Sequence, residues 1–159
     1  VKVIHEDNRN GWGAAIKLGI KEAVNERISF FPIDNQYSAD ELTKIINNSI
    51  GNIITFRIGS QNTLFRNFQS LVFKKIVNKF LNINFKDINS LKIIDRSYLI
   101  NNKFANDWEI DQDILLHIHN NEIKYEEIGI NLYKRNIGKS KTTFFDIFIL
   151  LLKIINKKK

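Results

Sequence analysis

The 159-residue sequence contains no cysteine, no methionine and a single proline. The absence of cysteine excludes a disulfide framework and every metal site built on thiolates. One proline and seven glycines leave little material for flexible linkers. Because the chain has no methionine and Val1 opens directly into an apolar run, we expect further sequence upstream of Val1. A chain of this length with 43% hydrophobic residues is expected to bury one core.

The positive charge of the sequence is confined to its last residues. Residues 134–159 hold eight Lys or Arg and one Asp, a net charge of +7, whereas residues 1–133 hold sixteen charges of each sign. A nucleic-acid-binding domain more often spreads its basic groups over a face of the fold, so we expect no nucleic-acid partner. The basic segment includes an apolar run, 144–155, which is too short to cross a bilayer. We predict that residues 142–159 form a basic amphipathic helix on an anionic membrane surface; an ordinary docking helix is the alternative.

The hydrophobic pattern alternates between strand and helix. Apolar runs predict strands over residues 1–5, 28–33 and 52–57, and later over 91–94 and 123–131. Helices are predicted over 11–24, 64–81 and 111–119, and one begins after Ser38, because Ser38 and Glu41 have the spacing of a capping box. This order predicts an α/β fold with a mostly parallel sheet. For the helix 64–81 we expect an apolar face made of Leu64, Phe65, Phe68, Leu71, Val72, Ile76 and Phe80.

Two short motifs have structural explanations that we prefer to functional ones. Gly11 and Gly13 lack the third glycine of a dinucleotide-binding loop, and two close glycines at a helix start also let a helix pack tightly on a sheet. His117 and His119 are two residues apart on a predicted helix and point to different sides, which disfavours a shared zinc ion.

Several polar residues stand where a ligand site is expected. Asp34 follows an apolar strand, and a carboxylate at that edge of an α/β sheet is placed to hold Mg²⁺ or Mn²⁺; an Asx-turn explains it equally well. Arg66 and Ser70 are four residues apart on one helix face, where they could hold a phosphate or be solvated. Asp111, at a helix start, suits the helix dipole and could also act as a general base or orient an acceptor.

The order of these segments resembles the polyprenol-phosphate branch of the family-2 glycosyltransferases, over residues 1–141. The matching stretches are the glycine-rich helix start, the strand before Asp34, the Arg57 strand, the Arg66–Ser70 pair and two later segments, Asp87–Lys92 and Glu127–Ser140. The resemblance implies the C-terminal portion of a GT-A, Rossmann-like, three-layer fold. It also implies a nucleotide-sugar donor, Mg²⁺ or Mn²⁺, and a lipid-phosphate acceptor.

By the same resemblance, Asp34 binds the metal and serves catalysis. Asp111 is the second expected catalytic residue, because of its own position at a helix start, where Asp111 or Glu109 could orient the acceptor. The donor and its phosphates are contacted by Gln36, Arg57, Arg66, Ser70, Arg135 and Ser140. The expected location is the cytoplasmic face of a membrane, peripheral or anchored. Pro32 replaces the first acid of the family's Asp-x-Asp pair, and the unit that holds the nucleotide base has no counterpart. The alternative is therefore a non-catalytic remnant or subunit that docks to a membrane or a protein.

Overall fold

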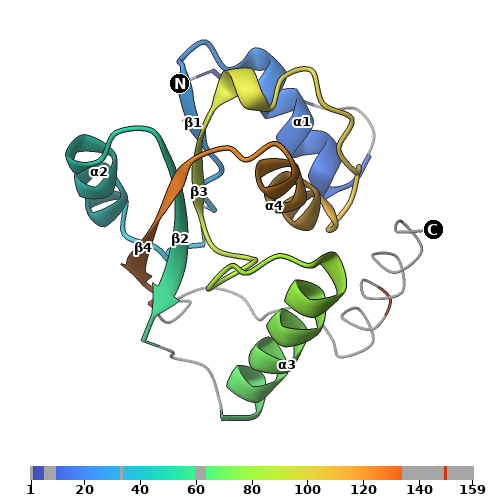
Figure 1. Ribbon diagram of the computed structural model, residues 1–159. Helices are drawn as coiled ribbons and strands as arrows, with labels where there is room; N and C mark the ends of the chain where they lie inside the picture. The colour runs from blue at the N-terminus through green and yellow to red at the C-terminus, as the bar shows by residue number, and fades with distance from the viewer. Residues whose placement is uncertain (1, 6–9, 33, 60–63, 134–148, 150–159) are drawn as a thin grey trace.

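The computed structural model describes residues 2–5, 10–32, 34–59, 64–133 and 149, and of residues 64–66 it describes the backbone alone (Figure 1). Helices and strands alternate along most of this part of the chain. In chain order they are α1 (Trp12–Glu22), β1 (Arg27–Ser29), α2 (Ala39–Asn48), β2 (Asn52–Ile58), α3 (Leu64–Leu81), β3 (Lys92–Asp95) with a 3₁₀ turn (Arg96–Tyr98), α4 (Ile110–Asn120) and β4 (Tyr125–Asn131).

The strands form one open sheet in the order β1-β3-β2-β4. β3 pairs antiparallel with both β1 and β2, and β2 pairs parallel with β4 over Asn52 to Ile58. The prediction of a mostly parallel sheet is therefore wrong for neighbouring strands, although β1, β2 and β4 run in one direction. The reason is the course of α3, which lies beyond the C-terminal end of β2 (Figure 1). The chain re-enters the sheet at that same end, so β3 runs antiparallel to β2.

Helices cover both faces of the sheet, which confirms the three-layer architecture. Neighbouring residues on a strand point to opposite faces. Ile53 and Ile93 pack with α2, whereas Ile54 and Ile94 pack with α1, α3 and α4 (Figure 1). The fold is thus mixed α/β with a four-stranded sheet buried between two helical layers.

The capping signal before α2 is confirmed in part. Ser38 Oγ accepts a hydrogen bond from the backbone N–H of Glu41 at 3.3 Å, as a helix N-cap requires. The Glu41 carboxylate does not complete the box at Ser38. It accepts hydrogen bonds from the backbone N–H and the side-chain amide of Asn131, at 3.1 and 2.9 Å, and so joins α2 to the end of β4.

Two predictions about local structure are wrong. Residues 2–5 carry no strand and are exposed, with Val3 at 68% and Ile4 at 42%, so this apolar run is not buried in the sheet. The helix over 64–81 has the predicted bounds, but it turns a different face to the core. Phe73 and Val77 are buried, whereas Phe68 and Leu71 are 64% and 51% exposed.

Candidate functional site

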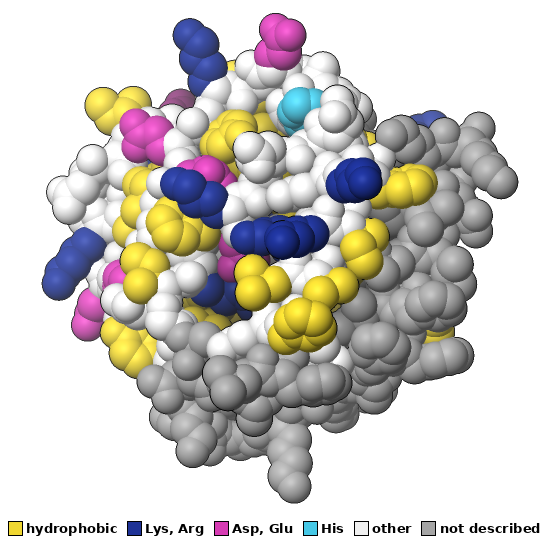
Figure 2. Space-filling model, turned by 60° about the horizontal axis from the view of Figure 1, so that its bottom comes forward, with side chains coloured by type: hydrophobic (Ala, Val, Ile, Leu, Met, Phe, Trp, Pro, Cys, Tyr) yellow, Lys and Arg dark blue, Asp and Glu magenta, His cyan; other side chains and the backbone are white. Residues whose placement is uncertain are grey.

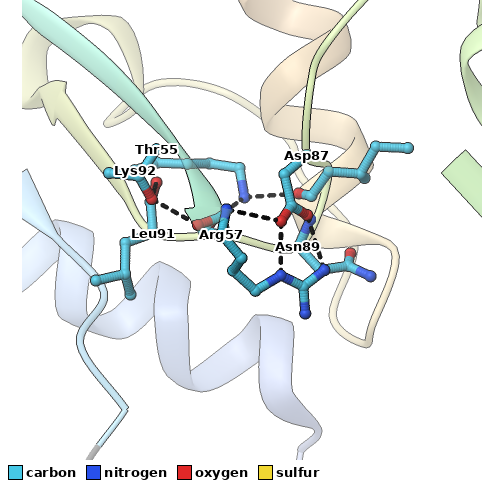
Figure 3. A network of polar contacts seen from close by, with 8 residues as sticks. Thr55, Arg57, Asp87, Asn89, Leu91 and Lys92 are labelled. Carbon is cyan, nitrogen blue, oxygen red and sulfur yellow. Dashed lines mark hydrogen bonds and ion pairs between the residues drawn. The ribbon is translucent and has the colours of Figure 1, made fainter. Parts of the chain in front are cut away.

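An arginine–carboxylate pair lies at the end of β2. Arg57 donates from Nε to Asp87 Oδ2 at 2.6 Å and from Nη2 to Asp87 Oδ1 at 2.9 Å (Figure 3). The backbone N–H of Arg57 also donates to Asp87 Oδ2, at 3.3 Å. Burial alone would lower the pKa of Arg57, but hydrogen bonding to Asp87 and the charges of Asp87, Tyr37 and Asp111 together raise it. The guanidinium is therefore held charged in one orientation.

A buried lysine, Lys92, lies at the start of β3, directly after the 87–91 loop. The first residue of that loop is Asp87, the partner of Arg57. The Lys92 side chain is 1% exposed, and its Nζ donates to the carbonyl oxygens of Ile88 and Ser90 at 3.0 and 3.1 Å. Its third partner is Asp111 Oδ1, at 2.6 Å, on the first turn of α4. The three ammonium hydrogens thus have three acceptors. Lys92 fastens the 87–91 loop and orients the Asp111 carboxylate, which is itself 27% exposed.

Tyr37 belongs to the segment between β1 and α2 and interacts with Arg57 and Asp87. Burial raises the pKa of Tyr37; Arg57 and a hydrogen bond with Ser90 lower it, and Asp87 and Asp34 raise it again, for a net increase. Ser90 in turn contacts Thr55 on β2, with the two hydroxyl oxygens 2.6 Å apart. The Asp34 segment, the end of β2 and the 87–91 loop therefore all lie near Tyr37.

The raised pKa of Tyr37 predicts a dependence of stability on alkaline pH. The folded protein ionises Tyr37 above the ordinary value of 10.0. Its contribution to stability is complete below that value and is lost as pH rises through the folded pKa. The ionisation of tyrosine would be followed by ultraviolet absorbance in the wild type and in Tyr37→Phe. The difference between the two titration curves should be the ionisation of Tyr37, with a midpoint above pH 10.0. The subtraction removes the signal of Tyr125, whose pKa is also raised. A component at or below pH 10.0 would contradict the buried position of Tyr37.

The predicted residues Asp34 and Gln36 form a turn at this same edge. Asp34 Oδ1 accepts the backbone N–H of Gln36 at 3.2 Å, and Asn35 has φ of 58°, so the Asx-turn is present. Gln36 O accepts the N–H of Tyr133 at 2.9 Å, just after β4. The turn places the Asp34 carboxylate near the ends of β2 and β4. The Asx-turn does not exclude metal binding by Asp34, since an ionised carboxylate can accept several partners at once.

The prediction of a metal site depends on one carboxylate, that of Asp34. Within the described residues, no group of three or more His, Cys, Asp or Glu side chains could hold an ion together, and that includes His117 and His119. Mg²⁺ is often bound by one or two carboxylates with the remaining ligands from substrate phosphates and water. Asp34 fits that mode of binding.

The other predicted phosphate-binding residues are not part of this cluster as far as the structure describes them. Ser70 is exposed on α3, and only the backbone of Arg66 is described. Arg135 and Ser140, together with the predicted membrane helix 142–159 apart from residue 149, lie outside the described residues. Of the predicted set, the structure brings together Asp34, Gln36, Arg57 and Asp111.

Sequence reasoning missed the partners of these residues. Asp87 and Lys92 belong to a segment noted for its resemblance, yet neither was expected to bind Arg57 or Asp111, and Tyr37 was not singled out. Asp87 is thirty residues from Arg57, and Lys92 is nineteen from Asp111, so no local spacing indicates either pair. The one available signal was the lysine itself, which stands inside an apolar strand sequence and needs acceptors when buried.

Comparison with known proteins gives no family or relative for this chain. No family model matches it, and no curated protein matches its sequence.

Proposed function

We propose that this chain is part of a glycosyltransferase of GT-A fold that moves a sugar from a nucleotide-sugar donor to a polyprenol-phosphate-type acceptor at a membrane surface. The observation that carries the proposal is the convergence around Tyr37 and Arg57. Asp34, Arg57 and Asp111 come from three separate segments, and each acts electrostatically on one of these two residues. The mixed α/β sheet with helices on both faces is compatible with this fold.

The chemistry of sugar transfer suits this set of side chains. Charge develops on the leaving diphosphate, and preorganised cations stabilise it. Arg57 is held in place by Asp87 before any ligand binds, which avoids reorganisation during the reaction. A divalent ion held by Asp34 would neutralise diphosphate charge. Lys92 holds the Asp111 carboxylate in one position. In this proposal Asp111 orients the acceptor, whose own phosphate oxygen is the nucleophile.

The membrane part of the proposal rests on charge. Residues 134–159 carry +7, and each basic group near an anionic surface contributes about 1 kcal/mol. The described helices include none with the length and apolar character needed to cross a bilayer.

A second candidate function is a non-catalytic docking module. The observation that favours it is that both site cations already have carboxylate partners, Asp87 for Arg57 and Asp111 for Lys92. Such pairs can serve the fold alone, and Pro32 stands where an acid would help to bind metal. Catalytic activity decides between the two candidates.

Replacing Asp34 with asparagine is expected to lower transfer at least about tenfold, because the carboxylate that neutralises the bound ion is lost. Transfer from nucleotide-sugars to a polyprenyl phosphate would be measured with Mg²⁺ or Mn²⁺, with and without a chelator. Asp40→Asn is the matched control, since Asp40 is an exposed acid on the first turn of α2. Unchanged transfer in Asp34→Asn removes Asp34 from the mechanism. These assays use the whole protein, with the sequence expected upstream of Val1. A folded whole protein that transfers no sugar favours the docking module.

A further inference from the structure

The outer side of α3 carries a stripe of exposed apolar side chains. Phe68 is 64% exposed, Leu71 is 51%, and Val72 and Ile76 are each 39%. Their spacing of three, four and eight residues from Phe68 puts them on one face of the helix. Single exposed apolar residues are ordinary, but a contiguous row marks a contact surface. We call these four residues the α3 stripe.

The charges of α3 are all of one sign. Its eighteen residues contain Arg66, Lys74, Lys75 and Lys79 and no acid. Residues 1–133 are neutral in total, so the remainder of that region carries a net charge of −4. Lys75 and Lys79 are exposed. On the face that Figure 2 brings forward, basic side chains lie beside apolar ones, with some acidic side chains among them.

Other residues of α3 hold the helix on the protein. The helix already buries Phe73 and Val77 in the core, with Phe80 and Leu81 packed against it. A helix with one face in the core and a second, apolar and basic, face outward has the composition that binds at a lipid interface. A protein partner with acidic groups would match the lysines, but the absence of any acid on the helix fits a continuous anionic surface best.

We propose that the α3 stripe and its lysines bind an anionic lipid surface, as a second contact besides residues 142–159. The inference rests on the membrane part of the proposed function and not on its chemistry. α3 begins shortly after β2 ends at Ile58, one residue beyond Arg57. Docking α3 on the bilayer therefore brings the end of β2, and with it the Arg57–Asp87 pair, toward the surface where a lipid phosphate is presented.

Vesicle sedimentation of the full chain tests this contact. Phe68→Gln/Leu71→Gln/Ile76→Gln removes the apolar stripe while keeping a residue that favours helix. We expect its partition onto vesicles of equal parts phosphatidylcholine and phosphatidylglycerol to fall at least about tenfold, since burial of each large apolar side chain is worth more than 1 kcal/mol. Lys75→Gln/Lys79→Gln should lose about fivefold for each lysine, equivalent to about 1 kcal/mol, on these vesicles and little on phosphatidylcholine alone.

The matched control removes equally apolar but unrelated side chains. Val24→Gln/Ile50→Gln changes residues that are 93% and 96% exposed elsewhere on the molecule, and it should bind vesicles as the wild type does. Equal binding by the stripe variant and the wild type overturns the inference. So does a clear loss of thermal stability in the stripe variant, or dissociation of a wild-type dimer by it, because either result means that the protein itself covers this face.

The outcomes separate this inference from the proposed function. If the wild type binds no vesicles, the inference and the membrane part of the function both fail. If binding depends on the α3 stripe but the protein transfers no sugar, the inference stands and only the enzymatic function fails.

Discussion

Replacing Gly13 with alanine is expected to lower the free energy of unfolding by about 3 kcal/mol, in the upper range for overpacked sites. A Cβ at this position would lie 2.4 Å from Ala105 O and within 2.8 Å of the backbone of Asn106 and Asp107. These are backbone atoms, which cannot rotate away as a side chain can. The neighbouring N–H of Ala14 donates to Asn106 O at 3.0 Å, so the helix and the 105–107 segment would have to separate and lose this bond.

Gly19→Ala is the matched control in the same helix. A Cβ at Gly19 meets nothing within 4 Å, and alanine favours a helix interior over glycine by about 0.5–1 kcal/mol. Urea unfolding followed by circular dichroism should therefore show the two variants shifting in opposite directions. A Gly13→Ala protein as stable as Gly19→Ala would mean that α1 does not approach the 105–107 segment this closely.

Gly11 and Gly13 show what a sequence motif can and cannot specify. A structural explanation for Gly11 and Gly13 was preferred to a phosphate-binding loop, and the close approach is present. Its partner, however, is the segment before α4 and not the sheet. The motif indicates that something must come near, whereas the identity of the neighbour depends on residues more than ninety positions away.

Local signals predicted the elements well where the chemistry is local. The Ser38 cap requires only Glu41 N–H three residues later, and the bounds of α3 and β2 follow from the pattern of the residues within them. The face of α3 and the order of the strands depend on which surfaces meet. α3 has apolar residues around most of its circumference, so its sequence permits either Phe68 or Phe73 to face the core.

The site was predictable to the same extent. The position of Asp34 after a strand indicated a site residue, because ligands bind at the carboxyl ends of strands in α/β sheets. Arg57 was indicated by the resemblance alone. The charge partners that hold the site together were not predictable, since Asp87 and Lys92 meet their partners only through the antiparallel return of β3. A reversed strand between two codirectional ones was the feature that the alternation of strands and helices did not indicate.

Lys92 is one of the residues that hold the 87–91 loop. Its ammonium group is buried with two backbone carbonyl groups and one carboxylate as acceptors. A buried ion pair contributes little net stability over an apolar pair, but removal of one partner leaves the other unsatisfied. In this site the loss would take one donor from each of three acceptors. Two of them belong to the buried residues Ile88 and Ser90, whereas the Asp111 side chain is 27% exposed.

We therefore expect Lys92→Met to lower the free energy of unfolding by about 3 kcal/mol, at the low end for a broken buried pair because Asp111 is partly hydrated. Asp111→Asn should also destabilise, since it leaves the Lys92 charge without a counter-ion. In the double variant, the loss in free energy of unfolding should be smaller than the sum of the two single losses. The difference, measured by urea unfolding, should be about 2 kcal/mol. Lys86→Met is the control, because Lys86 is 58% exposed and 3.7 Å from Glu127, and its change should stay within about 0.5 kcal/mol. Additive losses in the Lys92 and Asp111 variants would show that the two residues do not form the ion pair seen in the structure.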